Sequence, residues 1–261
     1  TRESLKTKVK YATILGTFQS TLTDFKYLSR EWKRNCEEER LLGVSLTGIM
    51  DNPLTNGSKK GLDKLLEELR DVAYETNKEW AEKLGIPPSA AITCVKPSGT
   101  VSQLVDSASG IHARHNPFYI RTVRADNKDP LCNLMKEMGF PNEPDVTKPD
   151  HTTVFSFPMK SPKDAVFRMD MTALEQLELW KTYATSWCEH KPSVTISVKE
   201  DEWVDVAAWV YENFDSISGI SFLPFSEHVY RQAPYQDCTK EEYEEALKTM
   251  PKNVDLSLIH I

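Results

Sequence analysis

Residues 91–124, AITCVKPSGTVSQLVDSASGIHARHNPFYIRTVR, decide the fold of this chain. The stretch opens with a short apolar run, residues 91–95, of the kind that forms a buried strand, and a tight loop follows at residues 96–99. After the loop, apolar residues recur at helical spacing: Val101, Leu104, Val105 and Ala108. The stretch therefore predicts a strand, a tight loop and the start of a helix, in that order.

The loop between the predicted strand and helix has the composition of an anion site. The first N–H groups of a helix have no partner inside it, and the helix dipole adds positive character there. Ser98, Thr100 and Ser102 supply hydroxyl groups, Gly99 lets the backbone approach a ligand closely, and Lys96 adds a charge. It is not a Walker A loop, because it lacks the Gly-Lys-Ser/Thr ending. We expect a phosphate group to bind here; the alternative is an ordinary strand-to-helix turn.

Cationic side chains follow the loop. His112, Arg114, His115, Arg121 and Arg124 could line a pocket for an anionic substrate, or they could be solvated charges of a surface loop. We prefer the surface interpretation for His115 and Arg124. Both interpretations stay open for His112.

The composition is that of a globular protein of the cytoplasm. The chain has 261 residues, 39% hydrophobic and 27% charged, with a formal net charge of −7 that argues against direct nucleic-acid binding. It contains no apolar run long enough to span a membrane and no signal-peptide pattern. Its five cysteines are scattered and form no Cys-x-x-Cys pair, so we expect neither a disulfide framework nor a metal site: Cys36, Cys94, Cys132, Cys188 and Cys238.

Two tripeptides place a cysteine beside residue types that take part in catalysis in other proteins. Asn35-Cys36-Glu37 falls in a charged helical segment, where successive side chains point about 100° apart and cannot converge on one substrate atom. Cys188-Glu189-His190 places a thiol beside an imidazole, but adjacent residues rarely reach the geometry of a nucleophile and its base. We expect both cysteines to be structural.

Helical and strand patterns alternate along most of the chain. The expected strands are residues 41–50, 91–95, 118–123, 152–157, 193–198 and 219–225. The expected helices are residues 5–22, 30–40, 62–84 and 203–214, with three more that follow the capping residues Asp129, Thr172 and Thr239. Residues 141–149 are expected to be a connector. This order predicts an α/β fold, with mostly parallel strands and outer helices, as a barrel or part of one.

Seven stretches together resemble the adenosylcobalamin-dependent (class II) ribonucleotide reductases. They are KYATILGTFQSTLTDFKYL, EEERLLGVSLTGIMDNP, ETNKEWAEKLGI, CVKPSGTVSQLVDSASGIH, FYIRTVRADNKDPL, FSFP and GISFLPFSEHVYRQAPYQ. The resemblance extends to about Val254, and it is closest to the monomeric ribonucleoside-triphosphate reductase branch.

The resemblance implies part of a ten-stranded α/β barrel and a radical reaction that makes deoxyribonucleotides for DNA replication. Adenosylcobalamin would generate a thiyl radical on a cysteine, and two further cysteines would reduce the ribonucleoside triphosphate. An allosteric deoxynucleotide and an external dithiol such as thioredoxin would be the other partners. The phosphate-binding loop of the family falls on Pro97, Ser98, Gly99, Thr100, Val101 and Ser102, and Lys96 and His112 are further candidates for the same pocket.

The chain also departs from the family pattern. It has no Asn-x-Cys-x-Glu motif for the radical cysteine, and neither the reductant cysteines nor the C-terminal cysteine pair is recognisable. We therefore expect no catalytic residue in this chain and no activity from it alone. Residues 1–254 are expected to be the C-terminal portion of the catalytic barrel. Residues 255–261 do not match the family. They are expected to be either the result of a truncation or a non-native tail.

Two alternatives remain from sequence. One is a diphosphate-using or iron-dependent reductase of the same superfamily. The other is a non-catalytic α/β module that binds phosphate.

Overall fold

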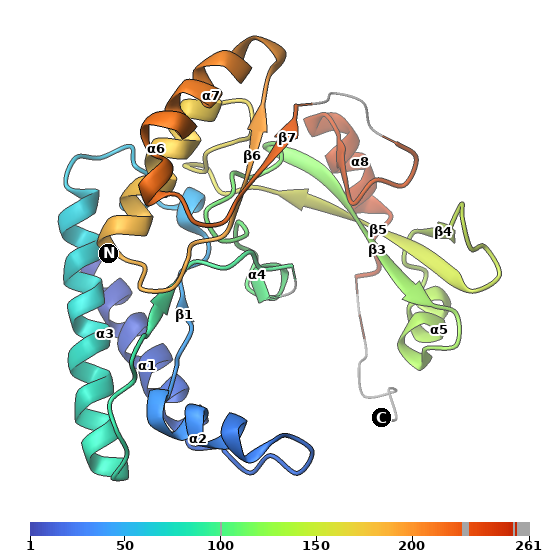
Figure 1. Ribbon diagram of the computed structural model, residues 1–261. Coiled ribbons are helices and arrows are strands. Elements are labelled where there is room, and N and C mark those ends of the chain that lie inside the picture. Colours follow the sequence, from blue (N-terminus) through green and yellow to red (C-terminus); the bar gives the residue numbers. More distant parts are fainter. Residues whose placement is uncertain (100, 226–229, 253, 255–261) are drawn as a thin grey trace. The chain divides into compact units, whose positions relative to one another are not determined.

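The computed structural model describes residues 1–99, 101–225, 230–252 and 254. The chain falls into two compact units. Unit 1 consists of Thr1–Ala113 and Asp164–Phe225, and unit 2 consists of Arg114–Lys163 with the described residues after residue 229. Figure 1 shows the elements of both units.

Unit 1 combines helices with two pairs of parallel strands. The helices are α1 (Arg2–Gln19), α2 (Arg30–Glu39), α3 (Leu62–Leu84), α4 (Val101–Leu104), α6 (Ala173–Ser186) and α7 (Trp203–Glu212), with 3₁₀ turns η1 (Ile49–Asp51), η2 (Glu200–Glu202) and η3 (Phe214–Ser216). The strands are β1 (Val44–Ser45), β2 (Thr93–Cys94), β6 (Val194–Val198) and β7 (Ile220–Pro224). β1 pairs with β2 and β6 pairs with β7, both in parallel. The parallel pairing expected from the alternating pattern is confirmed for these strands.

Local sequence signals set the ends of several helices as expected. The Ser29 side chain accepts a hydrogen bond from the Trp32 N–H (3.2 Å) at the start of α2, and Thr172 opens α6 with a reciprocal capping box. Gly85 closes α3 with φ +67°, a left-handed conformation that favours glycine. These predictions from the sequence are confirmed.

The core of unit 1 is centred on α6 and α3. Trp180, Tyr183 and Trp187 are fully buried, and each places its polar atom on a backbone carbonyl. The indole of Trp180 donates to Pro192 (3.1 Å), and that of Trp187 donates to Cys94 at the end of β2 (2.8 Å). Because buried polar atoms are costly when unbonded, these bonds fix how α6 packs against the strand that leads into the loop at residues 96–99.

Unit 2 is a four-stranded sheet with two helices. Its elements are β3 (Phe118–Asp126), α5 (Pro130–Glu137), β4 (Asn142–Pro144), β5 (Thr152–Lys160), β8 (Tyr235–Asp237) and α8 (Lys240–Lys248). The strand order is β4-β5-β3-β8, and every pairing is antiparallel. β3 and β5 pair over nine positions, from Phe118 opposite Lys160 to Asp126 opposite Thr152.

The antiparallel sheet corrects the expectation of mostly parallel strands for this part of the chain. A helix between two strands predicts a parallel crossover only when it carries the chain back to the same end of the sheet. α5 is short, and the chain re-enters the sheet through β4, which makes an antiparallel pair with β5. The expected connector at residues 141–149 therefore contains a strand.

The expected strand at residues 41–50 is also shorter than its apolar composition suggested. Only Val44–Ser45 is strand, because Gly48 takes a left-handed conformation (φ +70°) and leads into the 3₁₀ turn η1. That turn becomes part of the support for the loop at residues 96–102.

Candidate functional site

The loop at residues 96–102 follows β2 directly and presents much of its surface to solvent. Lys96, Pro97 and Gly99 are exposed, whereas Ser102 is buried. The Lys96 N–H donates to the Ser45 hydroxyl of the neighbouring strand (3.0 Å). Thr100 was also predicted to bind phosphate, and it lies outside the described residues. The loop thus leaves the sheet from a fixed point and reaches outward.

Serine hydroxyl groups hold the loop in one shape. The Ser98 N–H donates to the Ser109 hydroxyl oxygen (2.8 Å), and the Ser102 N–H donates to the Ser98 hydroxyl oxygen (2.8 Å). The Ser102 hydroxyl donates to the Ser98 carbonyl. These donors are therefore committed inside the protein, and a ligand at the loop would be met by the exposed backbone of Gly99, by Val101 and by the remaining proton of the Ser98 hydroxyl.

Residues 47–51 hold the segment that carries Ser109. The Ala108 N–H donates to a carboxylate oxygen of Asp51 (2.8 Å), and the Thr47 hydroxyl donates to the Ala108 carbonyl (3.0 Å). The Gly110 N–H donates to the Thr47 hydroxyl oxygen (3.0 Å), and the Gly48 N–H reaches the same Ala108 carbonyl (2.7 Å). Residues 47–51 thus fix both sides of Ser109, and Ser109 fixes the loop.

Gly110 is the position with the least space in this arrangement. Its backbone is left-handed (φ +54°), and a Cβ atom there would lie 2.9 Å from the carbonyl oxygen of Lys96. Real Cβ atoms do not approach backbone oxygen so closely, and the conformation itself disfavours any side chain. Only glycine therefore fits at this point without moving the start of the loop at Lys96.

The helix expected after the loop is much shorter than its spacing predicted. α4 ends at Leu104, and Val101, Leu104 and Val105 are 61%, 85% and 58% exposed. These apolar side chains form no buried face within unit 1, so nothing in this unit stabilises a longer helix. A four-residue helix also has little dipole. The predicted anion binding would therefore depend on individual N–H groups, hydroxyls and Lys96 rather than on a helix N-terminus.

His112 connects the loop support to β6. Its Nδ1 lies 3.1 Å from the Ser109 carbonyl, and its Nε2 accepts the Thr195 N–H (3.0 Å). Because Nε2 is the acceptor, the proton resides on Nδ1 and the ring is neutral. Burial lowers the pKa of His112, and the weaker opposing effect is its hydrogen bond to Ser109.

Both ring nitrogens of His112 are thus engaged by backbone groups. The ring also lines a small cavity of about 140 Å³ together with Arg168, Gln176 and Ser197. Its role in a substrate pocket stays a prediction.

The other cationic candidates lie in unit 2, where they have partners. Arg124 pairs with Asp145 (Nε to Oδ2, 2.7 Å), and His115 pairs with Asp237 (Nε2 to Oδ1, 2.6 Å). The guanidinium of Arg121 lies 4.4 Å from the ring centre of Tyr235. The side chain of His115 is only 12% exposed, so the expectation of a solvated surface charge is wrong for this residue: it is held between aromatic rings and a carboxylate.

Two cysteines of unit 1, Cys94 and Cys188, have a shifted pKa, and neither has an activated thiol. Burial and the neighbouring Cys94 raise the pKa of Cys188 to about 12, and burial also raises the pKa of Cys94. A raised pKa keeps a thiol protonated and unreactive at neutral pH. Cys36 lies half-buried on α2 with no disulfide partner. The structural interpretation of Cys188 is supported.

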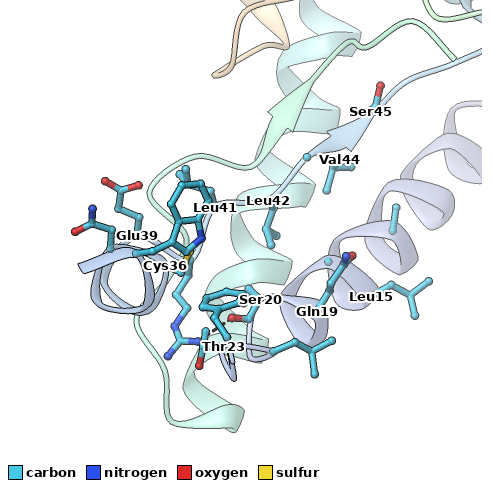
Figure 2. A pocket seen from close by; sticks show the side chains of 18 residues that line it. Leu15, Gln19, Ser20, Thr23, Cys36, Glu39, Leu41, Leu42, Val44 and Ser45 are labelled. Carbon is cyan, nitrogen blue, oxygen red and sulfur yellow. Dashed lines mark hydrogen bonds between the residues drawn. The ribbon is translucent and has the colours of Figure 1, made fainter. Parts of the chain in front are cut away.

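Unit 1 also has an open groove of about 780 Å³ between α1, α2 and β1 (Figure 2). Leu15 and Gln19 reach it from α1, Cys36 and Glu39 from α2, and Leu42 from the segment that enters β1. Nothing in the sequence pattern pointed to this groove.

Sequence reasoning found the loop but missed its support. Thr47, Asp51 and Ser109 hold the loop through contacts that span up to 61 positions in the chain. The only local signal was the presence of hydroxyl and carboxyl side chains in a glycine-containing segment. That signal does not identify the hydrogen-bond partners of these side chains.

A solved structure has the same fold as this chain. A crystal structure of a B-12 dependent (class II) ribonucleotide reductase matches 94% of this chain with a TM-score of 0.82 and 23% sequence identity, over 38% of its own length. The chain therefore has the α/β fold of one part of a class II ribonucleotide reductase. No family model matches the sequence.

Curated relatives specify the group within that class. The adenosylcobalamin-dependent ribonucleoside-triphosphate reductase of Euglena gracilis is 31% identical over 88% of this chain and 32% of its own length. That of Lactobacillus acidophilus is 26% identical over 98% of this chain and 38% of its own length. The chain is homologous to one part of the adenosylcobalamin-dependent ribonucleoside-triphosphate reductases, and it spans about a third of their length. The resemblance found in the sequence is confirmed.

No helix among the described residues is long and apolar enough to cross a membrane.

Proposed function

We propose that this chain supplies the C-terminal portion of the catalytic barrel, residues 1–254, to an adenosylcobalamin-dependent ribonucleotide reductase. The whole enzyme would convert ribonucleoside triphosphates to deoxyribonucleotides. The role of this chain would be to hold the phosphate groups of the substrate in the loop formed by Pro97, Ser98, Gly99, Thr100, Val101 and Ser102. Residues 255–261 lie outside the described part, and their assignment as a tail stays a prediction.

The observation that carries this proposal is the fixed shape of the loop. Ser98 is held by Ser109 on one side and by Ser102 on the other, while Gly99 remains exposed. Its N–H, the Ser98 hydroxyl proton and the Lys96 ammonium group are of the kind that binds phosphate oxygens. Hydrogen bonds to a charged group contribute about 1.5–3 kcal/mol each when the donors are already in place. A preformed loop binds its ligand without the entropy cost of ordering.

The residues of this chain bind and orient the substrate, and they do not carry the radical. Adenosylcobalamin supplies a radical when it is bound to the whole enzyme. The described residues do not identify a site for its corrin ring. The groove beside β1 is lined largely by apolar side chains, and its arginine, Arg40, already donates to the carbonyls of Glu37 and Ser20. No step of the reaction is therefore assigned to the cofactor within this chain.

The other partners belong to the whole reductase. An allosteric deoxynucleotide and an external dithiol such as thioredoxin follow from membership of this class, and we propose both. The five cysteines of this chain form no disulfide, which supports a reducing compartment such as the cytoplasm. The names of the relatives support a triphosphate substrate over a diphosphate, and adenosylcobalamin over iron.

A paired substitution tests the loop. Ser98→Ala with Gly99→Ala removes a hydroxyl donor and adds a Cβ where nothing lies within 4 Å in the free protein, so the fold should be kept. We expect a ribonucleoside triphosphate to bind at least about tenfold more weakly, since about 1.4 kcal/mol corresponds to a tenfold change. The nucleoside without phosphates should be unaffected.

Ser216→Ala with Gly219→Ala is the matched control. These residues also carry an exposed hydroxyl and a glycine with free space around it, and they lie in a different connection of unit 1. Equal triphosphate affinity in the loop variant and the control would refute the role of the loop. The non-catalytic module would gain support if the loop binds phosphate but no reductase activity appears when the remaining polypeptide of a relative is supplied.

A further inference from the structure

His112 lies where the chain leaves the sheet after β2 to form the proposed phosphate loop. Just after β2, the Val95 carbonyl still accepts the Ser193 N–H at the start of β6 (2.9 Å). The next N–H group on this edge of β6 belongs to Thr195, because residues two apart in a strand direct their N–H groups to the same side. By that point the chain after β2 has turned away into the loop. The imidazole of His112 accepts the Thr195 N–H instead (Nε2, 3.0 Å).

The same ring also holds the returning end of the loop. Its Nδ1 lies 3.1 Å from the Ser109 carbonyl oxygen, and the backbone N–H of His112 donates to that oxygen as well (2.9 Å). The Ser109 hydroxyl oxygen in turn accepts the Ser98 N–H inside the loop (2.8 Å). A single side chain thus connects β6, through Ser109, to Ser98.

This connection depends on a neutral imidazole. Burial lowers the pKa of His112, and β6 carries no charged side chain. Among the described residues that line the cavity beside the ring, Arg168 is the only charged group. On the packed turn η1, the Asp51 carboxylate accepts the Ala108 N–H (2.8 Å). No carboxylate in the described lining is therefore placed to stabilise an imidazolium ion, and a protonated Nε2 would direct a second N–H at the Thr195 N–H.

We propose that His112 is a positioning residue of the proposed phosphate loop: its neutral ring takes the place of the departing strand beside β6 and thereby fixes Ser109 and Ser98 for triphosphate binding. This role rests on the proposed function, because the loop must bind phosphate for its position to affect the substrate. It differs from a direct contact with the substrate, since both ring nitrogens already have backbone partners.

Two amide variants separate the two contacts of the ring. In His112→Gln the side-chain oxygen can reach the position of Nε2 and accept the Thr195 N–H, but no donor stands at the position of Nδ1. In His112→Asn the amide nitrogen can replace Nδ1 and donate to Ser109, but nothing reaches Thr195. Each variant keeps one half of the connection. We expect a ribonucleoside triphosphate to bind about fivefold more weakly to either variant in isothermal titration calorimetry, as expected for one lost hydrogen bond.

His190→Gln is the matched control. His190 is a second half-buried histidine of unit 1, and its Nε2 lies 2.7 Å from the backbone carbonyl oxygen of Leu42. That carbonyl belongs neither to the loop nor to the residues that support it. The control should lose stability through its own contact and should bind the triphosphate as tightly as the native chain.

Amide NMR shows whether the ring acts on the loop. In the free ¹⁵N-labelled chain, we expect the Ser98 and Ser102 amide resonances to move in both His112 variants and to stay in place in His190→Gln. A histidine that only stabilises the fold would leave these resonances unchanged. If neither His112 variant folds, the side-chain ¹⁵N spectrum of the native chain decides. At about pH 7.5 it should show the proton of His112 on Nδ1 and none on Nε2.

Three results would overturn the inference. One is that both His112 variants bind the triphosphate as tightly as the native chain does. Another is that His190→Gln weakens binding and moves the loop amides as much as the His112 variants do. The third is a proton on Nε2 of His112 in the native chain. A native chain that binds no triphosphate would instead refute the proposed function, and the amide resonances would still decide whether His112 holds the loop.

Discussion

Replacing Gly110 by alanine perturbs the proposed phosphate loop while leaving every residue of the loop itself unchanged. The change forces a Cβ into a left-handed backbone (φ +54°) and to 2.9 Å from the Lys96 carbonyl oxygen. The left-handed conformation alone costs about 1–2 kcal/mol for a residue with a side chain. Because the neighbour is backbone and not a flexible side chain, the clash must also displace Lys96 or the segment around Ser109.

We expect the Gly110→Ala chain to remain folded and to bind a ribonucleoside triphosphate about tenfold more weakly, corresponding to about 1.4 kcal/mol. The displacement separates Ser98 from the Ser109 hydroxyl, so part of the binding energy is used to restore the loop. Isothermal titration calorimetry measures the affinity, and the thermal midpoint measures the change in stability.

Gly85→Ala is the control for the backbone conformation. Gly85 has a similar φ (+67°), and a Cβ there would meet nothing within 4 Å. Both variants should lose stability, but only Gly110→Ala should lose affinity. Equal triphosphate affinity in the two variants would refute the reasoning that the contact between Gly110 and Lys96 sets the loop.

Two further predictions concern His112 and Tyr183. Because burial holds the folded pKa of His112 below its ordinary value of about 6.5, the unfolded chain takes up a proton first as pH falls, so stability decreases below that value. His112→Gln should make the urea midpoint fall less between pH 7.5 and 5.5, and an unchanged slope would contradict a buried neutral ring. Tyr183→Phe removes the hydroxyl that donates to the buried Thr55 carbonyl (2.7 Å) and should cost about 1–3 kcal/mol of unfolding free energy, whereas Tyr211→Phe on the surface should cost nothing measurable. Equal urea midpoints for the two tyrosine variants would exclude this bond as a source of stability.

The sequence predicted those parts of the fold that are encoded locally. The caps at Ser29 and Thr172 and the terminator Gly85 depend on residues within one turn of each other, and the structure confirms them. The strand expected before the loop is likewise present as β2, because a short apolar run such as the one before Lys96 is typical of a buried strand.

Features that depend on distant partners could not be predicted in this way. The antiparallel pairing of β3 with β5 follows from where α5 returns the chain, which periodicity does not encode. The apolar spacing of Val101, Leu104 and Val105 predicted a buried helical face, and the structure exposes all three. The helical spacing of these apolar residues is present in the sequence, but no surface within unit 1 covers their side chains.

The candidate site shows the same division. Ser98, Gly99 and Ser102 stand in a contiguous motif and were found from it. Asp51 and Ser109 hold that motif in shape through contacts with segments distant in sequence, so only the three-dimensional structure reveals them.

We propose that the backbone of this loop binds phosphate, and an NMR titration detects such binding residue by residue. A ribonucleoside triphosphate is added to the ¹⁵N-labelled chain, and the amide resonances of the loop are followed. We expect large shifts for Gly99 and Val101, small shifts for the internally bonded Ser98 and Ser102 amides, and none when the phosphate-free nucleoside is added. Shifts confined to residues outside 96–102, or equal shifts with the nucleoside, would contradict it.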